Sequence, residues 1–109
     1  MAYDQDLEHR IDTLKTSIPG LVKKKMFGGV GYLVNGNMCF GIHKNFLVVR
    51  TSVEKAQQLL KNDSVSVFDI TGRPMKGWVM VAPTGLKSDS ELLNKLETGL
   101  EFALSLRSK

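Results

Sequence analysis

The sequence has few of the side chains that most often perform catalysis or bind metal ions. It contains one cysteine and two histidines in 109 residues. The single cysteine, Cys39, cannot form an internal disulfide, and zinc sites usually need four ligands drawn largely from cysteine and histidine. His43 follows Cys39 by four residues on one predicted strand, which separates their backbones by about 13 Å at ~3.3 Å per residue. We therefore expect no metal site, no cofactor and no catalytic cluster.

Long apolar runs are also missing. No apolar stretch follows the opening MAYDQDLEHR, so the pattern of an export signal is absent, and no segment has the roughly 20 apolar residues that a membrane span needs. We expect a cytoplasmic chain without membrane association. A hydrophobic content of 42% is enough for one globular domain over residues 1–109 without a disulfide.

The glycine-rich stretch KKKMFGGVGY, residues 23–32, does not match a nucleotide-binding loop. A phosphate loop needs GxxxxGK[ST] leading into a helix. The dinucleotide pattern fails because Val34 stands where the third glycine would fall. Asn35-Gly36 follows, and this dipeptide favours a type I′ turn between two strands. The stretch is therefore predicted to be part of a hairpin.

Apolar periodicity and capping residues predict three helices. Leu7, Ile11, Leu14 and Ile18 share one helical stripe, which Pro19-Gly20 ends. Thr51 with Glu54, and Ser88 with Glu91, form two capping-box patterns. The first opens a short helix through Lys61. The second opens the last helix, whose apolar stripe is Leu92, Leu93, Leu96, Leu100, Ala103 and Leu104.

Five strands complete the expected fold. Three form a meander with turns at Asn35-Gly36 and Lys44-Asn45, and SVSVFDI and GWVMVA form two more, joined by the loop TGRPMKG. The element order αβββαββα predicts an α+β fold of two layers with a five-stranded antiparallel sheet. In that loop we expect Arg73 to be an anchor, with Asp69 as one partner, because its guanidinium offers five donors in a fixed fork.

A two-residue turn at Asn35-Gly36 sets the expected register. It pairs Tyr32 with Cys39, and a tight turn at Lys44-Asn45 brings Arg50 beside Cys39. The core side of the meander is then Leu33, Met38, Phe40, Ile42, Leu47 and Val49. The opposite face, with Tyr32, Val30, Cys39, Val48 and Arg50, is largely apolar, so we expect it to be covered by another segment, by a protein partner or by a second copy in a homodimer.

Six side chains are candidates for interaction: Tyr32, Cys39, Arg50, Arg73, Lys76 and Trp78. Arg50 could lower the pKa of the Cys39 thiol, although a buried structural cysteine is the favoured interpretation. Arg73 and Lys76 could hold an anion while Trp78 stacks on a ring. The favoured alternative is that Trp78 packs inward and both cations are solvated.

Positive charge gathers in the middle of the chain. The net charge is +4, but residues 21–86 hold nine basic and three acidic side chains. Lys23, Lys24 and Lys25 form a candidate basic patch for nucleic acid, together with Arg73 and Lys76. A solvated lysine-rich surface explains the same charges.

Four segments together resemble the TfoX/Sxy N-terminal domain family: MFGGVG from Met26, NGNM from Asn35, Val49-Arg50, and TGRPMKGW from Thr71. The resemblance implies a compact bacterial domain of secretion-chaperone-like architecture. Named members regulate natural competence and act with the cyclic-AMP receptor protein. We expect this chain to lack their C-terminal domain, so competence control does not transfer directly.

These observations lead to three functional hypotheses. The first is a non-enzymatic bacterial interaction or regulatory domain, a transcriptional co-regulator that acts through protein partners. The alternative is direct nucleic-acid binding through the basic residues of segment 21–86. A weaker alternative is a small-ligand or enzyme site around Tyr32, Cys39, Arg50 and Trp78.

Overall fold

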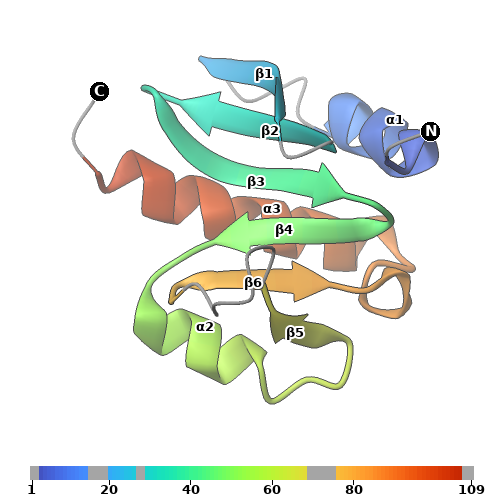
Figure 1. The fold of residues 1–109 in the computed structure, drawn as a ribbon, viewed down its shortest axis with the longest axis vertical. Coiled ribbons are helices and arrows are strands. Elements are labelled where there is room, and N and C mark those ends of the chain that lie inside the picture. The colour runs from blue at the N-terminus through green and yellow to red at the C-terminus, as the bar shows by residue number, and fades with distance from the viewer. Residues whose placement is uncertain (1–2, 15–19, 27–28, 69–75, 107–109) are drawn as a thin grey trace.

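An antiparallel sheet forms the centre of the molecule (Figure 1). The computed structural model describes residues 3–14, 20–26, 29–68 and 76–106. Within them the sheet has six strands in the order β1-β2-β3-β4-β6-β5. The strands are β1 Leu21–Met26, β2 Gly29–Val34, β3 Asn37–His43, β4 Phe46–Arg50, β5 Val65–Val67 and β6 Trp78–Val81. The predicted α+β class is confirmed. The predicted number of five strands was wrong, because the lysine-rich residues 21–26 form an additional strand at one edge of the sheet.

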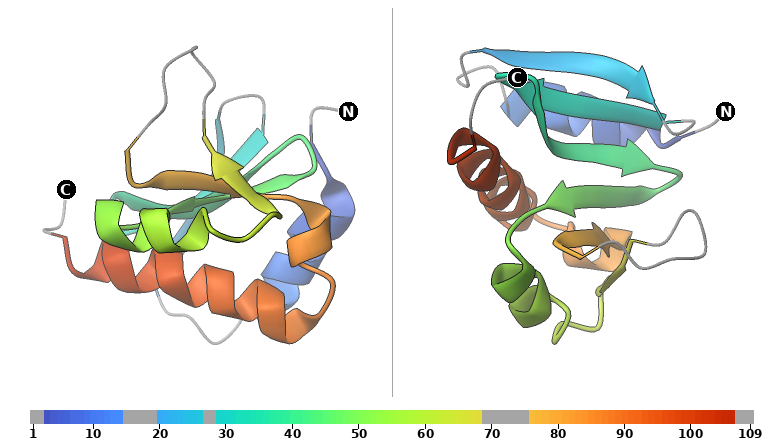
Figure 2. Two further views of the ribbon diagram at one scale, coloured as in Figure 1. Left: turned by 90° about the horizontal axis from the view of Figure 1, so that it is seen from below. Right: turned by 60° about the vertical axis from the view of Figure 1, so that its left-hand side comes forward.

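The helices lie on one side of this sheet (Figure 2). They are α1 Gln5–Leu14, α2 Val53–Leu59 and α3 Asp89–Leu104, and a 3-10 helix, η2, spans Pro83–Gly85. The helix α3 contacts β2, β3 and β4, whereas α2 contacts β6. The two-layer arrangement follows from the apolar stripe of each helix, which has to be buried against the sheet.

The ends of the helices show how local sequence sets them. The Ser88–Glu91 capping box of α3 is confirmed. In α2 the N-cap is Ser52 rather than Thr51, and its Oγ accepts a hydrogen bond from the Lys55 N–H. Thr51 is buried and donates its N–H to Gly77 at 2.7 Å. The predicted apolar stripe of α3 was wrong at its end, since Leu104 is 54% exposed.

A bulge between β2 and β3 changes the expected register. Asn35 and Gly36 have φ of 53° and 79°, which confirms the positive φ that the turn requires, and Leu33 pairs with Met38 as predicted. Beyond them the register shifts, so that Tyr32 pairs with Phe40 and Gly31 with Gly41, rather than with Cys39 and Phe40. Cys39 is the extra residue on β3. Because side chains alternate across a strand, one added residue exchanges the two faces on either side of it.

Two apolar clusters occupy the two faces of the sheet. The larger lies beneath the helices and includes Phe40, Ile42, Leu47 and Val49 as predicted, together with Tyr32, Val30 and Cys39, which were expected on the other face. The smaller contains Met38, Val48 and Phe68, with Leu33, Trp78 and Met80 packed against it. The placement of Leu33 and Met38 in the helix-side core was therefore wrong.

The bulge lies directly below α3 at Gly99. A Cβ on Gly99 would collide with the carbonyl oxygen of Cys39 and approach the Phe40 ring to 3.5 Å. Only a residue without a side chain lets the helix come this close to β3. Gly99 is thus a packing glycine inside a helix, at a position where alanine would otherwise be the better helix former.

We expect Gly99→Ala to destabilise the protein. The substitution improves helix propensity by about 1 kcal/mol, but overpacking against the β3 backbone costs about 1–3 kcal/mol or more. Urea denaturation should show a lower midpoint. The matched control is Asn94→Ala on an exposed position of α3, which should hold or slightly raise the midpoint. A midpoint of Gly99→Ala equal to that of the control would contradict the close contact.

Candidate functional site

Tyr32 and Cys39 belong to the helix-side core and not to an exposed face. Both are fully buried. The Tyr32 hydroxyl donates to Asp12 of α1 at 2.8 Å, and its ring lies 5.1 Å from the ring of Phe40. Burial raises the pKa of the Cys39 thiol to about 11, so the thiolate that Arg50 was considered to favour is disfavoured instead. His43 contacts Phe68 on the other face, apart from Cys39.

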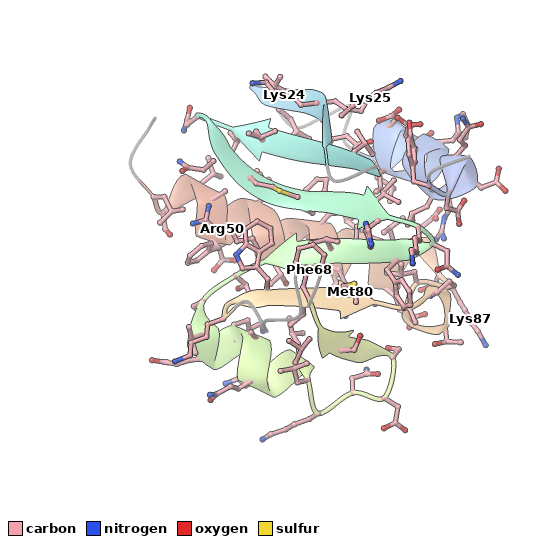
Figure 3. The ribbon with its side chains drawn as sticks, viewed as in Figure 1. Lys24, Lys25, Arg50, Phe68, Met80 and Lys87 are labelled. Atoms are coloured by element: carbon pink, nitrogen blue, oxygen red, sulfur yellow. The ribbon has the colours of Figure 1, made fainter. Side chains whose placement is uncertain are left out.

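The three lysines of the candidate basic patch do not act together. Lys23 Nζ donates to Glu8 and Asp12 of α1, each at 2.9 Å, and these carboxylates raise the lysine's pKa. Lys24 and Lys25 are exposed on β1 and follow each other along the strand, so they point to opposite faces (Figure 3). Charged side chains on an edge strand protect it from pairing with another chain. The triplet therefore has a structural explanation at this edge.

Arg50, at the end of β4, is placed between elements that are far apart in sequence. Its cross-strand neighbour is Trp78 on β6. The guanidinium carbon lies 5.5 Å from the centre of the Trp78 ring and 5.5 Å from that of Phe102 on α3. Both distances are within the range of cation–π attraction. Within the described part of the chain, Arg50 has neither a salt bridge nor a side-chain hydrogen bond.

An apolar groove of about 230 Å³ lies between α2 and the β5–β6 end of the sheet. Its wall on α2 is mostly apolar, and two valines that line it are exposed to water, Val53 at 45% and Val67 at 38%. We call it the α2–β5 groove, and it is lined by Val53, Ala56, Gln57, Leu60, Val67, Lys76, Gly77 and Trp78. Trp78 thus contributes to the groove and contacts Arg50 as well.

A larger polar cleft of about 600 Å³ lies between the start of α2 and α3. Phe102, one of the two rings beside Arg50, lines this cleft, whereas Trp78, the other ring, lines the α2–β5 groove. Its charged side chains are Lys55, Glu97 and Glu101. The two glutamates make this cleft the less favourable route for an anion approaching Arg50.

The sheet face opposite the helices is largely covered at its centre. Phe68 is fully buried there, with its ring 5.9 Å from that of Trp78, and it lies in front of the sheet near Met80 (Figure 3). Met38 and Val48 beneath are 7% and 1% exposed. Among the described residues, the apolar side chains at the centre of this face are therefore buried.

The structure brings together three of the six candidate residues, Arg50, Lys76 and Trp78. It places Tyr32 and Cys39 in the core, while Arg73 and its suggested partner Asp69 lie outside the described residues. The sequence reasoning missed the apolar wall of α2. Val53, Ala56 and Leu60 have the spacing of one helical stripe, and this signal could have identified it.

Two general features bear on what the site can hold. Over residues 3–14, 20–26, 29–68 and 76–106, no three His, Cys, Asp or Glu side chains gather in a geometry suited to a metal ion. The described helices fall short, in length or in apolar character, of a membrane crossing.

Alkaline pH should destabilise the protein through its buried acidic groups. The thiol of Cys39 ionises near pH 9.0 when unfolded but near 11 when folded, so the stability it contributes is complete below pH 9 and falls as pH rises toward 11. Burial and the Asp12 hydrogen bond raise the pKa of Tyr32 in the same direction. We expect Cys39 to account for a fall of about 1–3 kcal/mol in the free energy of unfolding.

Urea unfolding from pH 7 to pH 11 measures this effect, with Cys39→Ala beside the wild type. The free energy of unfolding of the variant should fall less steeply between pH 9 and 11, and the remaining fall is the one due to Tyr32. The slopes of the free energy of unfolding against pH are compared, rather than its values, because loss of the buried sulfur lowers stability at every pH. Equal slopes would show that the thiol is accessible to water.

Comparison with known proteins agrees with the sequence motifs. The family model for the TfoX N-terminal domain matches residues 13–103, a span that runs from α1 into α3 and includes Arg50 and the whole α2–β5 groove. No curated protein and no solved structure gave a significant match. Because the family match covers most of the 109 residues, this chain belongs to the TfoX N-terminal domain family.

Proposed function

We propose that this chain is a non-enzymatic interaction domain that binds a protein partner through the α2–β5 groove, and that it serves as a bacterial regulator, with transcriptional co-regulation as the expected setting. The observation that carries the proposal is the exposure of Val53 and Val67 on the two walls of one groove. Single exposed valines are normal on the surface of a monomer. Valines that face a common hollow, however, form a surface that a partner can bury.

The charges around the groove support a protein or other acidic partner. Lys76 lines the groove, and Arg50 lies behind Trp78 without a described carboxylate. Aromatic residues and arginine are also the side chains most enriched at energetically important points of protein interfaces. The groove therefore combines an apolar wall, an aromatic ring and positive charge.

Direct nucleic-acid binding has weaker support. The described lysines of the candidate patch are separated, since Lys24 and Lys25 lie on the edge strand β1 whereas Lys76 precedes β6, four strands away in the sheet order. Lys23 is already paired with two carboxylates. An enzymatic role has weaker support still, because Tyr32 and Cys39 are buried away from Arg50 and Trp78.

Affinity capture with matched variants tests the proposal. The tagged chain is produced at native level in cells that naturally make it, and extracts are treated with nuclease. Val67→Glu places a negative charge in the groove. The control, Val22→Glu, makes the same substitution at a valine of β1 that is 53% exposed and lies outside the groove. We expect Val67→Glu to reduce recovery of specific proteins about tenfold or more, because burial of a valine contributes about 1.5–3 kcal/mol.

The Val22→Glu protein should recover the same partners as the wild type. Urea midpoints of both variants should stay near the wild-type value, since both positions are exposed. If recovery is equal for the two variants, or if no specific protein is recovered, the groove is not the binding surface. Retention that disappears with nuclease and weakens steeply with salt would favour the nucleic-acid alternative.

A further inference from the structure

We infer that Arg50 is the receptor for a carboxylate, and that the segment occupying the α2–β5 groove is an apolar stretch of a partner protein carrying an aspartate or glutamate beside its apolar residues. This inference rests on the proposed function and adds the chemistry of the partner. It assigns to Arg50 a role in selecting that partner.

The Arg50 guanidinium lies between two aromatic rings. Two aromatic rings, Trp78 and Phe102, lie at 5.5 Å from its central carbon. Rings attract a cation through their π-electrons, but they do not replace the acceptors that the five N–H groups need in the guanidinium plane. No salt bridge or side-chain hydrogen bond to Arg50 occurs among the described residues. The side chain is thus held in place with its donors available.

A carboxylate fits Arg50 better than the phosphates of a nucleic acid. A carboxylate accepts two parallel hydrogen bonds from a guanidinium fork, and a partly buried pair of this kind is stronger than a solvated one. Arg50 is partly buried. A bound protein segment would exclude further water from it. Phosphates along a nucleic acid would need several cations in a row, and Lys24 and Lys25 lie at the opposite sheet edge.

Trp78 connects Arg50 to the groove. Trp78 lines the groove and contacts Arg50, so a chain that packs on Trp78 passes close to the guanidinium. Lys76 is exposed and lines the same groove, so its positive charge also favours a negatively charged side chain on the bound segment. The glutamates of the polar cleft, Glu97 and Glu101, lie on the Phe102 side and disfavour approach of an anion from there. The acidic residue therefore enters from the Trp78 side.

The test uses short peptides selected from a randomised displayed library on the immobilised wild-type chain. Binding is followed by the fluorescence of Trp78, which is the only tryptophan in the sequence. Each selected peptide is also made with its acidic residue changed to the matching amide. We expect apolar peptides that contain an aspartate or glutamate, and the amide form should bind wild type roughly tenfold more weakly or worse.

The same peptide pairs are then measured on Arg50→Gln and Arg50→Lys. With Arg50→Gln the acid and amide forms should bind about equally, whereas Arg50→Lys should retain part of the difference because it keeps the charge but loses the fork. Urea midpoints separate this from a structural role. If Arg50 only holds α3 to the sheet, Arg50→Gln lowers the midpoint but leaves the difference between acid and amide unchanged, and the inference is wrong.

The remaining outcomes separate this inference from the proposed function. Peptides that lose binding with Val67→Glu but show no preference for an acidic residue would overturn the carboxylate assignment and leave the groove as a protein-binding surface. Failure to select any peptide that depends on Val67 would overturn both. A DNA or RNA oligonucleotide that changes Trp78 fluorescence, and loses binding with Arg50→Gln, would assign Arg50 to phosphate instead.

Discussion

The close approach of α3 to β3 at Gly99 is the contact on which the arrangement of both sheet faces depends. It occurs at the bulge, where Cys39 is the extra residue and its carbonyl oxygen lies where a Gly99 side chain would be. The helix lies directly on the strand there, so Cys39, Phe40 and Tyr32 are enclosed beneath it. The bulge then leaves Met38 on the other face, where Val48 and Phe68 cover it. Without the bulge, a regular pairing of β2 with β3 would place Tyr32 and Cys39 on the face opposite the helices and Met38 on the helix side.

This packing also determines where an apolar hollow is left at the surface. With α3 over the middle strands and Phe68 over the opposite face, the α2–β5 groove lies at the margin of the sheet. Arg50 is the last residue of β4, and its guanidinium lies 5.5 Å from the ring of its cross-strand neighbour Trp78 and 5.5 Å from that of Phe102 on α3. The side chain thus links the end of β4 both to Trp78, which lines the groove, and to the C-terminal half of α3.

The sequence predicted the features that depend on neighbouring residues. The Asn35-Gly36 turn, the tight turn at Lys44-Asn45 and the Ser88–Glu91 capping box are all confirmed, since each is set within a few residues. Features set by distant contacts were missed. The bulge depends on α3, which begins fifty residues after Cys39, and nothing in the local alternation marks the extra residue. The groove was missed for the same reason, because its walls come from α2, β5 and β6.

The two edges of the sheet are built in opposite ways, and this contrast bears directly on function. The β1 edge carries three consecutive lysines, one of them fixed by Glu8 and Asp12, and such an edge repels a further strand or an apolar partner. The β5 edge is short and presents Val67 beside Val53 and Trp78. Val22, at 53% exposure, adjoins the lysines of β1, whereas Val53 and Val67 face one groove together with Trp78. A shared apolar hollow of this kind, rather than exposure of a single valine, is the surface that a partner can bury.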